Sequence, residues 1–270
     1  MITDQVKLDG FDATLKLYLY DYTEALYINE RPLILVCPGG GYNHLSKREG
    51  EIMALQFMAM GYNAAVLSYS LRPVTYPTQF FEIGAAFKYL KENAGELHII
   101  PDRIVVCGFS AGAHVAGMLG TGYDLPLLLN KLSAEPGYLK PAGQILCYPV
   151  ITSGEYAHRG SFDCLLGDRA NDKDLLSLVS LETRVDEKTV PTFMWHTVGD
   201  KAVPLENSLL FAEALRKNNV PFEYHVFPTG GHGLGLATGL TASDASLKEV
   251  DAGASQWITL CRSWLERLFV

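Results

Sequence analysis

Ser110 stands at the centre of the sequence Gly-Phe-Ser-Ala-Gly, between an apolar run that predicts a buried strand and a small-residue segment that predicts a helix. A serine in this strand–turn–helix setting forms a nucleophile elbow, a sharp turn that presents the hydroxyl at the end of a sheet. Gly108 and Gly112 carry no side chain that would clash with the strand or the helix. The pattern favours acyl transfer by a serine nucleophile over its alternative, a glycine-rich turn that cradles a phosphate.

A serine nucleophile requires a general base, and the base requires an acid that fixes its tautomer. In enzymes of this type the chain order is serine, acid, histidine, and each residue follows a strand. Asp200 follows the apolar run 192–198, and His232 lies in a glycine-rich loop after the run 222–227. We favour Asp200 as the acid because its loop and that of His232 follow consecutive strands. Three other carboxylates compete for the acid position: Glu155, Asp163 and Asp168.

Three successive glycines at 39–41 follow another apolar run, and they let backbone N–H groups approach a ligand without obstruction. The N–H groups of Gly40 and Gly41, with that of Ala111 at the first turn of the elbow helix, are the candidates for an oxyanion hole. Tyr42 comes next and has two open interpretations, a wall of the acyl pocket or plain packing. A dinucleotide site is excluded, because neither glycine stretch gives Gly-x-Gly-x-x-Gly opening a helix.

The other histidines have plainer interpretations. His114 lies four residues after Ser110 and is expected to pack or bond locally on the elbow helix. His196 and His225 lie within predicted strands and are expected to fill the core or a sheet face. His, Cys and Asp residues nowhere have the spacing of metal ligands, so we expect no metal and no cofactor.

The elements that must position these residues alternate along the chain between apolar runs and helical patterns. Strands are expected at 33–37, 63–69, 104–107, 144–150, 192–198 and 222–227. Helices are expected at 49–60, 78–92, 205–218 and 255–268, after an antiparallel hairpin of 6–8 with 15–20. This alternation predicts the α/β class, with a mostly parallel, doubly wound sheet flanked by helices.

The length of 270 residues fits one domain over residues 1–270, with room for an insertion. Two segments break the strand–helix rhythm, 121–141 with its prolines and glycines and 151–189 with its accumulated charges. We expect a lid or insertion in these segments, its small helical part lying over the carboxyl ends of the strands.

Composition narrows the class of partner. A formal charge of −8 argues against a nucleic acid or an anionic membrane surface as partner. The N-terminal residues lack the layout of a signal peptide, and no apolar run reaches the length of a membrane span. The five cysteines are odd in number, and three of them lie in apolar runs where a reduced thiol acts as a small hydrophobe. We expect a soluble cytoplasmic protein.

Five ordered motifs carry a resemblance that covers about residues 30 to 265. They are Pro38-Gly-Gly-Gly-Tyr42, Ser68-Tyr-Ser-Leu-Arg-Pro73, Gly108-Phe-Ser-Ala-Gly112, Val198-Gly-Asp200 and Gly231-His-Gly233. With them the chain resembles bacterial α/β-hydrolase fold esterases, more closely the acetyl-esterase and acetyl-xylan-esterase-like carboxylesterases related to the hormone-sensitive-lipase group. One departure is Pro38, which stands where the family has a histidine before the glycines.

The resemblance implies a serine carboxylesterase that hydrolyses short-chain acyl esters, often acetyl esters, of small alcohols, phenols or sugars. The reaction would pass through an acyl-enzyme on Ser110, and a homo-oligomer is implied because family members are commonly oligomeric. Two alternatives stay open. One is a serine amidase, peptidase or formamidase that uses the same triad, and the other is a non-catalytic ligand-binding protein on a hydrolase scaffold.

Overall fold

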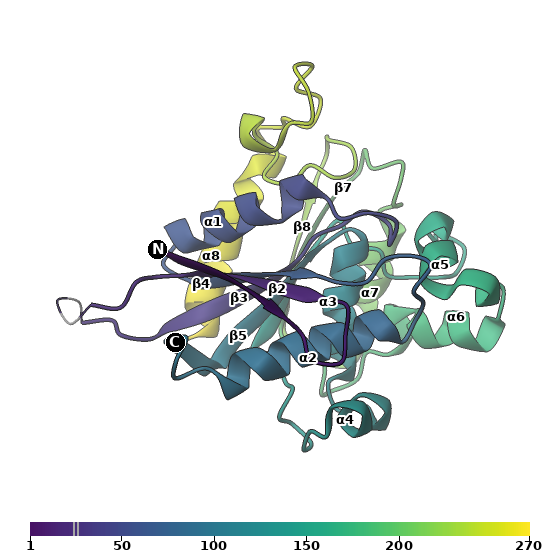
Figure 1. Cartoon of the computed structure of the whole chain (residues 1–270). Helices are drawn as coiled ribbons and strands as arrows, with labels where there is room; N and C mark the ends of the chain where they lie inside the picture. Colours follow the sequence, from purple (N-terminus) through teal and green to yellow (C-terminus); the bar gives the residue numbers. More distant parts are fainter. Residues whose placement is uncertain (24, 26) are drawn as a thin grey trace.

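The computed structural model of the chain describes residues 1–23, 25 and 27–270, and within them eight strands form one sheet in the order β1-β2-β4-β3-β5-β6-β7-β8 (Figure 1). The strands are β1 Ile2–Lys7, β2 Thr14–Leu19, β3 Arg31–Cys37, β4 Asn63–Ser68, β5 Ile99–Phe109, β6 Gly143–Cys147, β7 Thr192–Thr197 and β8 Phe222–Phe227. The pairs β1–β2 and β2–β4 are antiparallel, and all later pairs are parallel. The predicted hairpin and mostly parallel sheet are therefore confirmed.

The apolar runs form central strands because both faces of the sheet are covered. In β3, Leu33 and Leu35 point into one buried cluster, whereas Ile34 and Val36 point into the other. This is the alternation that a pleated strand imposes. All four side chains are fully buried, which is why the run reads as continuously apolar and not as alternating.

Helices cover the sheet on both sides (Figure 1). On one side lie α1 (Glu51–Ala59) and α8 (Trp257–Leu268), which contribute Phe57 and Trp257 to the core. On the other side lie α2 (Thr78–Glu92), α3 (Ala111–Gly122) and α7 (Glu206–Lys217). Of the described helices, none is long and apolar enough to cross a membrane.

The two segments outside the alternating pattern lie in different places. Residues 151–189 are helical as expected, with α5 (Arg159–Leu166) and α6 (Lys173–Val179) near the carboxyl ends of the strands. The expectation of a lid over residues 121–141 needs correction, because α4 (Pro126–Leu132) packs along α2 instead. Its Leu128 and Leu132 occupy the space left by the missing side chain of Gly84. The single domain over residues 1–270 stays a prediction.

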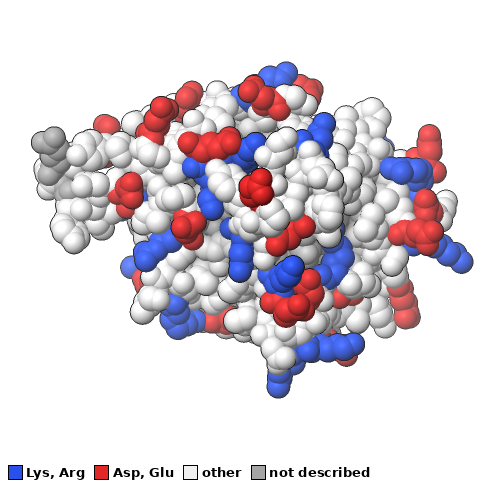
Figure 2. All heavy atoms as spheres, turned by 90° about the horizontal axis from the view of Figure 1, so that it is seen from below, with Lys and Arg blue, Asp and Glu red and all other residues white. Residues whose placement is uncertain are grey.

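Charged residues of both signs are interspersed on the face seen in Figure 2. On α2, Lys88 pairs with Glu92, and Lys91 pairs with Asp102 of β5. Ion pairs at a surface typically contribute about 0–1 kcal/mol each. Packing of apolar side chains, and not these pairs, therefore holds the helix on the sheet.

Candidate active site

The turn between β5 and α3 holds Ser110 in a conformation that few residues adopt. Its φ of 54° and ψ of −120° cost about 1–3 kcal/mol in an ordinary chain. The turn is tight enough that a Cβ on Gly108 would overlap the carbonyl oxygen of Gly112, and one on Gly112 would overlap that of Cys37. The two glycines are thus required for the turn, as the sequence pattern predicts.

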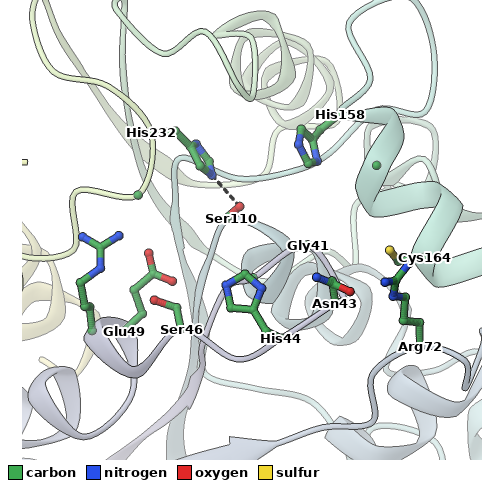
Figure 3. Close-up of a pocket in the computed structure, with 14 residues that line it drawn as sticks. Gly41, Asn43, His44, Ser46, Glu49, Arg72, Ser110, His158, Cys164 and His232 are labelled. Atoms are coloured by element: carbon green, nitrogen blue, oxygen red, sulfur yellow. Dashed lines mark hydrogen bonds between the residues drawn. The ribbon is translucent and has the colours of Figure 1, made fainter. Parts of the chain in front are cut away.

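Three residues from separate loops form one hydrogen-bonded chain. Ser110 Oγ lies 2.7 Å from His232 Nε2 (Figure 3), and His232 Nδ1 lies 2.6 Å from Asp200 Oδ2. Because a carboxylate only accepts, Nδ1 carries the proton and donates it to Asp200, while Nε2 accepts from the serine hydroxyl. The His232 side chain is 22% exposed and the Asp200 side chain is fully buried. Solvent therefore reaches the three hydrogen-bonded side chains at the histidine and serine end.

Asp200 is buried, yet it is held in its ionised form. Its Oδ1 accepts the N–H groups of Ala202 and Val203, both at 2.9 Å. Its Oδ2 accepts from His232 and from His196 Nε2, the latter at 3.1 Å. Burial raises the pKa of Asp200, but the hydrogen bonds from His196, His232 and Val203 outweigh it, and the pKa lies well below its usual range.

The loop after β3 adopts the conformation that its glycines allow. Gly40 has a φ of +126° and Gly41 a φ of +63°, and a Cβ on Gly40 would overlap the carbonyl oxygen of His44. The N–H of Gly39 donates to Glu49 Oε2 at 3.0 Å, which ties the base of the loop to the start of α1. Gly40 and Gly41 line the same pocket as Ser110. Their use as oxyanion donors, with Ala111, stays a prediction.

Comparison with known proteins places the chain among families of hydrolases and their relatives. Two family models match the chain, BD-FAE over residues 18–141 and the prolyl oligopeptidase family over residues 160–250. The chain is 40% identical over 216 residues to endo-1,4-beta-xylanase B of Butyrivibrio fibrisolvens, a match that covers 77% of this chain and 33% of that protein. The chain spans between a third and about half of the length of the curated relatives that it matches.

Solved structures match the whole chain. The acetyl ester-xyloside bifunctional hydrolase from Caldicellulosiruptor lactoaceticus is 38% identical, with a TM-score of 0.81 over 97% of this chain and 90% of that one. The chain belongs to the α/β-hydrolase esterases. The carboxylesterase Cest-2923 from Lactobacillus plantarum WCFS1, at 28% identity, superimposes with a TM-score of 0.88 over 99% of this esterase and 98% of that chain.

A pocket of about 480 Å³ opens over Ser110 in this esterase (Figure 3). The glycine loop after β3, the elbow, the His232 loop and α5 all contribute to its wall. Its side chains are largely polar and include Asn43, His44, Arg72, His158 and Cys164. The volume is at the small end of the range for ligand sites, about 300–1,000 Å³. Arg72 and Cys164 also line a second, adjoining hollow of about 620 Å³.

Tyr42 is not a wall of this pocket, which corrects one of its two sequence interpretations. The side chain is 1% exposed, and its hydroxyl donates to His114 Nδ1 at 2.7 Å. His114 in turn donates from Nε2 to the carbonyl oxygen of Val179 at 2.7 Å. Both partners are more than 60 residues away, so His114 is packed in the core as one expectation had it, but it does not bond locally on the elbow helix. Tyr42 follows two glycines with positive φ and itself has a φ of 59°, which turns its side chain inward.

The structure also places near Ser110, His232 and Asp200 several residues that the sequence analysis did not single out. His196, expected only to fill the core, is buried against Asp200, and Glu49 and Tyr148 are buried beneath the His232 loop. Tyr148 directly follows β6, so the rule that site residues follow strands would have found it. His158 lines the pocket from the start of α5 with its Nδ1 2.8 Å from Ser161 Oγ. Among the described residues, no cluster of three His, Cys, Asp or Glu side chains has the geometry of a metal site.

Proposed function

We propose that this esterase hydrolyses short-chain acyl esters, above all acetyl esters, of small alcohols, phenols or sugars through an acyl-enzyme on Ser110. The observation that carries the proposal is the hydrogen-bonded chain from Ser110 through His232 to Asp200, which ends in the pocket. The similarity to an acetyl ester hydrolase at 38% identity supports the acetyl group, and the small pocket supports a short acyl chain.

In the first half-reaction, Ser110 Oγ attacks the ester carbonyl carbon and gives its proton to His232 Nε2. Asp200 stays ionised and stabilises the imidazolium through the bond to Nδ1. The carbonyl oxygen becomes an oxyanion, which the N–H groups of Gly40, Gly41 and Ala111 would hold. The tetrahedral intermediate collapses, the C–O bond to the alcohol breaks, and His232 returns its proton to the departing oxygen.

In the second half-reaction, a water molecule gives a proton to His232 and attacks the acyl carbon. The second tetrahedral intermediate releases Ser110, which takes the proton back from His232. One ester and one water yield one acid and one alcohol, and no redox change occurs. The groups that act in the first half-reaction act again in the second, so both halves use one site.

Amide hydrolysis is the second candidate, because the same triad cleaves amides and residues 160–250 match the prolyl oligopeptidase family. It ranks lower because the structures that match the whole chain include hydrolases of esters. A p-nitroanilide substrate measured beside the ester separates the two. Faster turnover of the anilide at equal concentration would favour the amidase.

The test is a panel of p-nitrophenyl acetate, butyrate and octanoate and an acetylated sugar, with wild type, Ser110→Ala and His232→Ala. We expect acetate turnover to exceed octanoate turnover and to fall about 10³-fold or more in both variants. Activity that survives either substitution would mean that the nucleophile or the base is another residue. A fluorophosphonate probe provides a further check. If it does not label wild type, and wild type binds the ester without hydrolysing it, the protein is a ligand-binding protein and not an enzyme.

A further inference from the structure

Glu49 is a buried carboxyl group, 2% exposed. It lies between the loop after β3, which we call the oxyanion loop because its N–H groups would hold the oxyanion, and the loop that carries His232. Its Oε2 accepts the N–H of Gly39 at 3.0 Å, and its Oε1 accepts the hydroxyl of Tyr148 at 2.7 Å. Figure 3 shows the Glu49 carboxyl group pointing into the space below His232. Both oxygens therefore have a donor, which is what a buried carboxylate needs to offset its loss of water.

Tyr148 continues this chain to the loop of the catalytic histidine. Its hydroxyl oxygen accepts the N–H of Gly235 at 2.9 Å, three residues after His232. Its ring lies edge-to-face against the His232 imidazole, with 5.2 Å between the ring centres. Burial raises the pKa of Tyr148 well above its usual range, and the charge of Glu49 raises it further. The tyrosine thus keeps the proton that it donates to Glu49.

The two loops joined in this way are rich in glycine. The oxyanion loop holds three glycines in succession, and the His232 loop holds glycines at 230, 231, 233 and 235. Glycine has more conformational freedom than any other residue, so neither loop is stiff by its own sequence. Acyl transfer, however, needs the donors and the base held to about 0.5 Å of the productive geometry. A specific tie between the loops would supply what their sequences lack.

We propose that Glu49 and Tyr148 are positioning residues that fix the oxyanion loop relative to His232. The chain Gly39–Glu49–Tyr148–Gly235 reaches from the loop that would hold the oxyanion to the loop that carries the base. Glu49 lines the pocket, but neither residue is hydrogen-bonded to Ser110 Oγ or to the ring nitrogens of His232. Their loss therefore reduces the stabilisation of the transition state more than the binding of the ester. The proposal rests on the proposed function, since it assigns these residues to the Ser110 reaction.

The experiment compares Tyr148→Phe, Glu49→Gln and the double variant with wild type and Ser110→Ala, measuring kcat and KM for p-nitrophenyl acetate. Two buried residues away from the site provide matched controls. Glu82→Gln alters a buried carboxyl group bonded to Ser70, and Tyr62→Phe alters a buried tyrosine of the same apolar cluster as Tyr148. Melting temperatures for all variants show how much stability each substitution removes.

We expect kcat to fall about 10- to 100-fold in Tyr148→Phe and Glu49→Gln, with KM within about threefold of wild type. The double variant should be little worse than the poorer single one, because both break the same chain. The controls should lose stability without a comparable loss of kcat.

A kcat within twofold of wild type in Tyr148→Phe would overturn the proposal, as would single effects that multiply in the double variant. If Glu49→Gln does not fold, Tyr148→Phe alone decides. Full activity in Ser110→Ala would refute the proposed function instead, which separates the two failures.

Discussion

Replacing Asp200 with Asn tests the proposed mechanism most directly, because the structure determines which way the amide must face. Oδ1 accepts two backbone N–H groups at 2.9 Å, so an NH₂ group at that position would meet two donors. The amide oxygen therefore stays there, and the NH₂ group turns toward His232. It then donates to Nδ1, which moves the imidazole proton to Nε2, where it faces the Ser110 hydroxyl. The base can no longer accept the proton of the serine.

The magnitude follows from that tautomer change. Loss of the correct tautomer in a serine triad costs about 10⁴-fold in kcat, equivalent to about 5 kcal/mol of transition-state stabilisation. The assay is steady-state hydrolysis of p-nitrophenyl acetate by Asp200→Asn, with KM measured in the same runs. KM should change little, since Asp200 is buried behind His232 and does not line the pocket.

Glu155→Gln is the matched control, because Glu155 competes with Asp200 by its place in the sequence but is exposed in the structure. It should retain wild-type kcat within about twofold. If Asp200→Asn kept more than a tenth of wild-type kcat, the acid of the triad would be another residue. A loss confined to KM would show that Asp200 acts in binding and not through His232.

Three further predictions concern the turn, the core and the pocket. Gly112→Ala should destabilise the protein by about 3 kcal/mol or more, seen as a lower melting temperature, because its methyl group meets backbone atoms that cannot move aside; an unchanged melting temperature would contradict the close approach. Burial lowers the pKa of His114 to about 4 in the folded protein. Between about pH 6.5 and pH 4 only the unfolded chain takes up the proton, so the free energy of unfolding should fall by about 3 kcal/mol as the pH falls through this range. Urea titrations should show a smaller fall in His114→Gln, and an equal fall would assign the pH dependence elsewhere. Cys164→Phe should lower kcat/KM about tenfold more for the butyrate than for the acetate ester, because it narrows the pocket; equal losses would place the acyl group away from α5.

The sheet and the meeting of Ser110, His232 and Asp200 were predictable because each has a local signal. Strand runs buried on both faces are continuously apolar, and β8 and α2 have the predicted ends, Phe222–Phe227 and Thr78–Glu92. Ser110, Asp200 and His232 all follow strands, and parallel strands bring their carboxyl ends to one edge of the sheet. Strand order therefore brings these residues together without any knowledge of side-chain packing.

The contact between Glu49 and Tyr148 had no local signal, although Tyr148 itself follows a strand. Glu49 and Tyr148 are 99 residues apart, and nothing near either in the sequence indicates a partner. The sequence leaves Tyr42 between two interpretations because the direction of its side chain depends on the backbone of the glycines before it. At residues 121–141, the break in the strand–helix pattern shows that the segment is irregular but not which surface it covers.

One part of the pocket wall comes from outside the strand ends. Ser110, Asp200 and His232 follow strands, whereas the lining residues His158, Gly160 and Cys164 belong to residues 151–189. That segment is held at its start by Asn207 of α7, whose Oδ1 accepts the N–H groups of residues 151 and 152. Substitutions in residues 151–189 can thus change which ester is bound without changing the residues that would cleave it. Exchange of this one stretch between related enzymes would change which ester is accepted while Ser110, His232 and Asp200 keep their geometry.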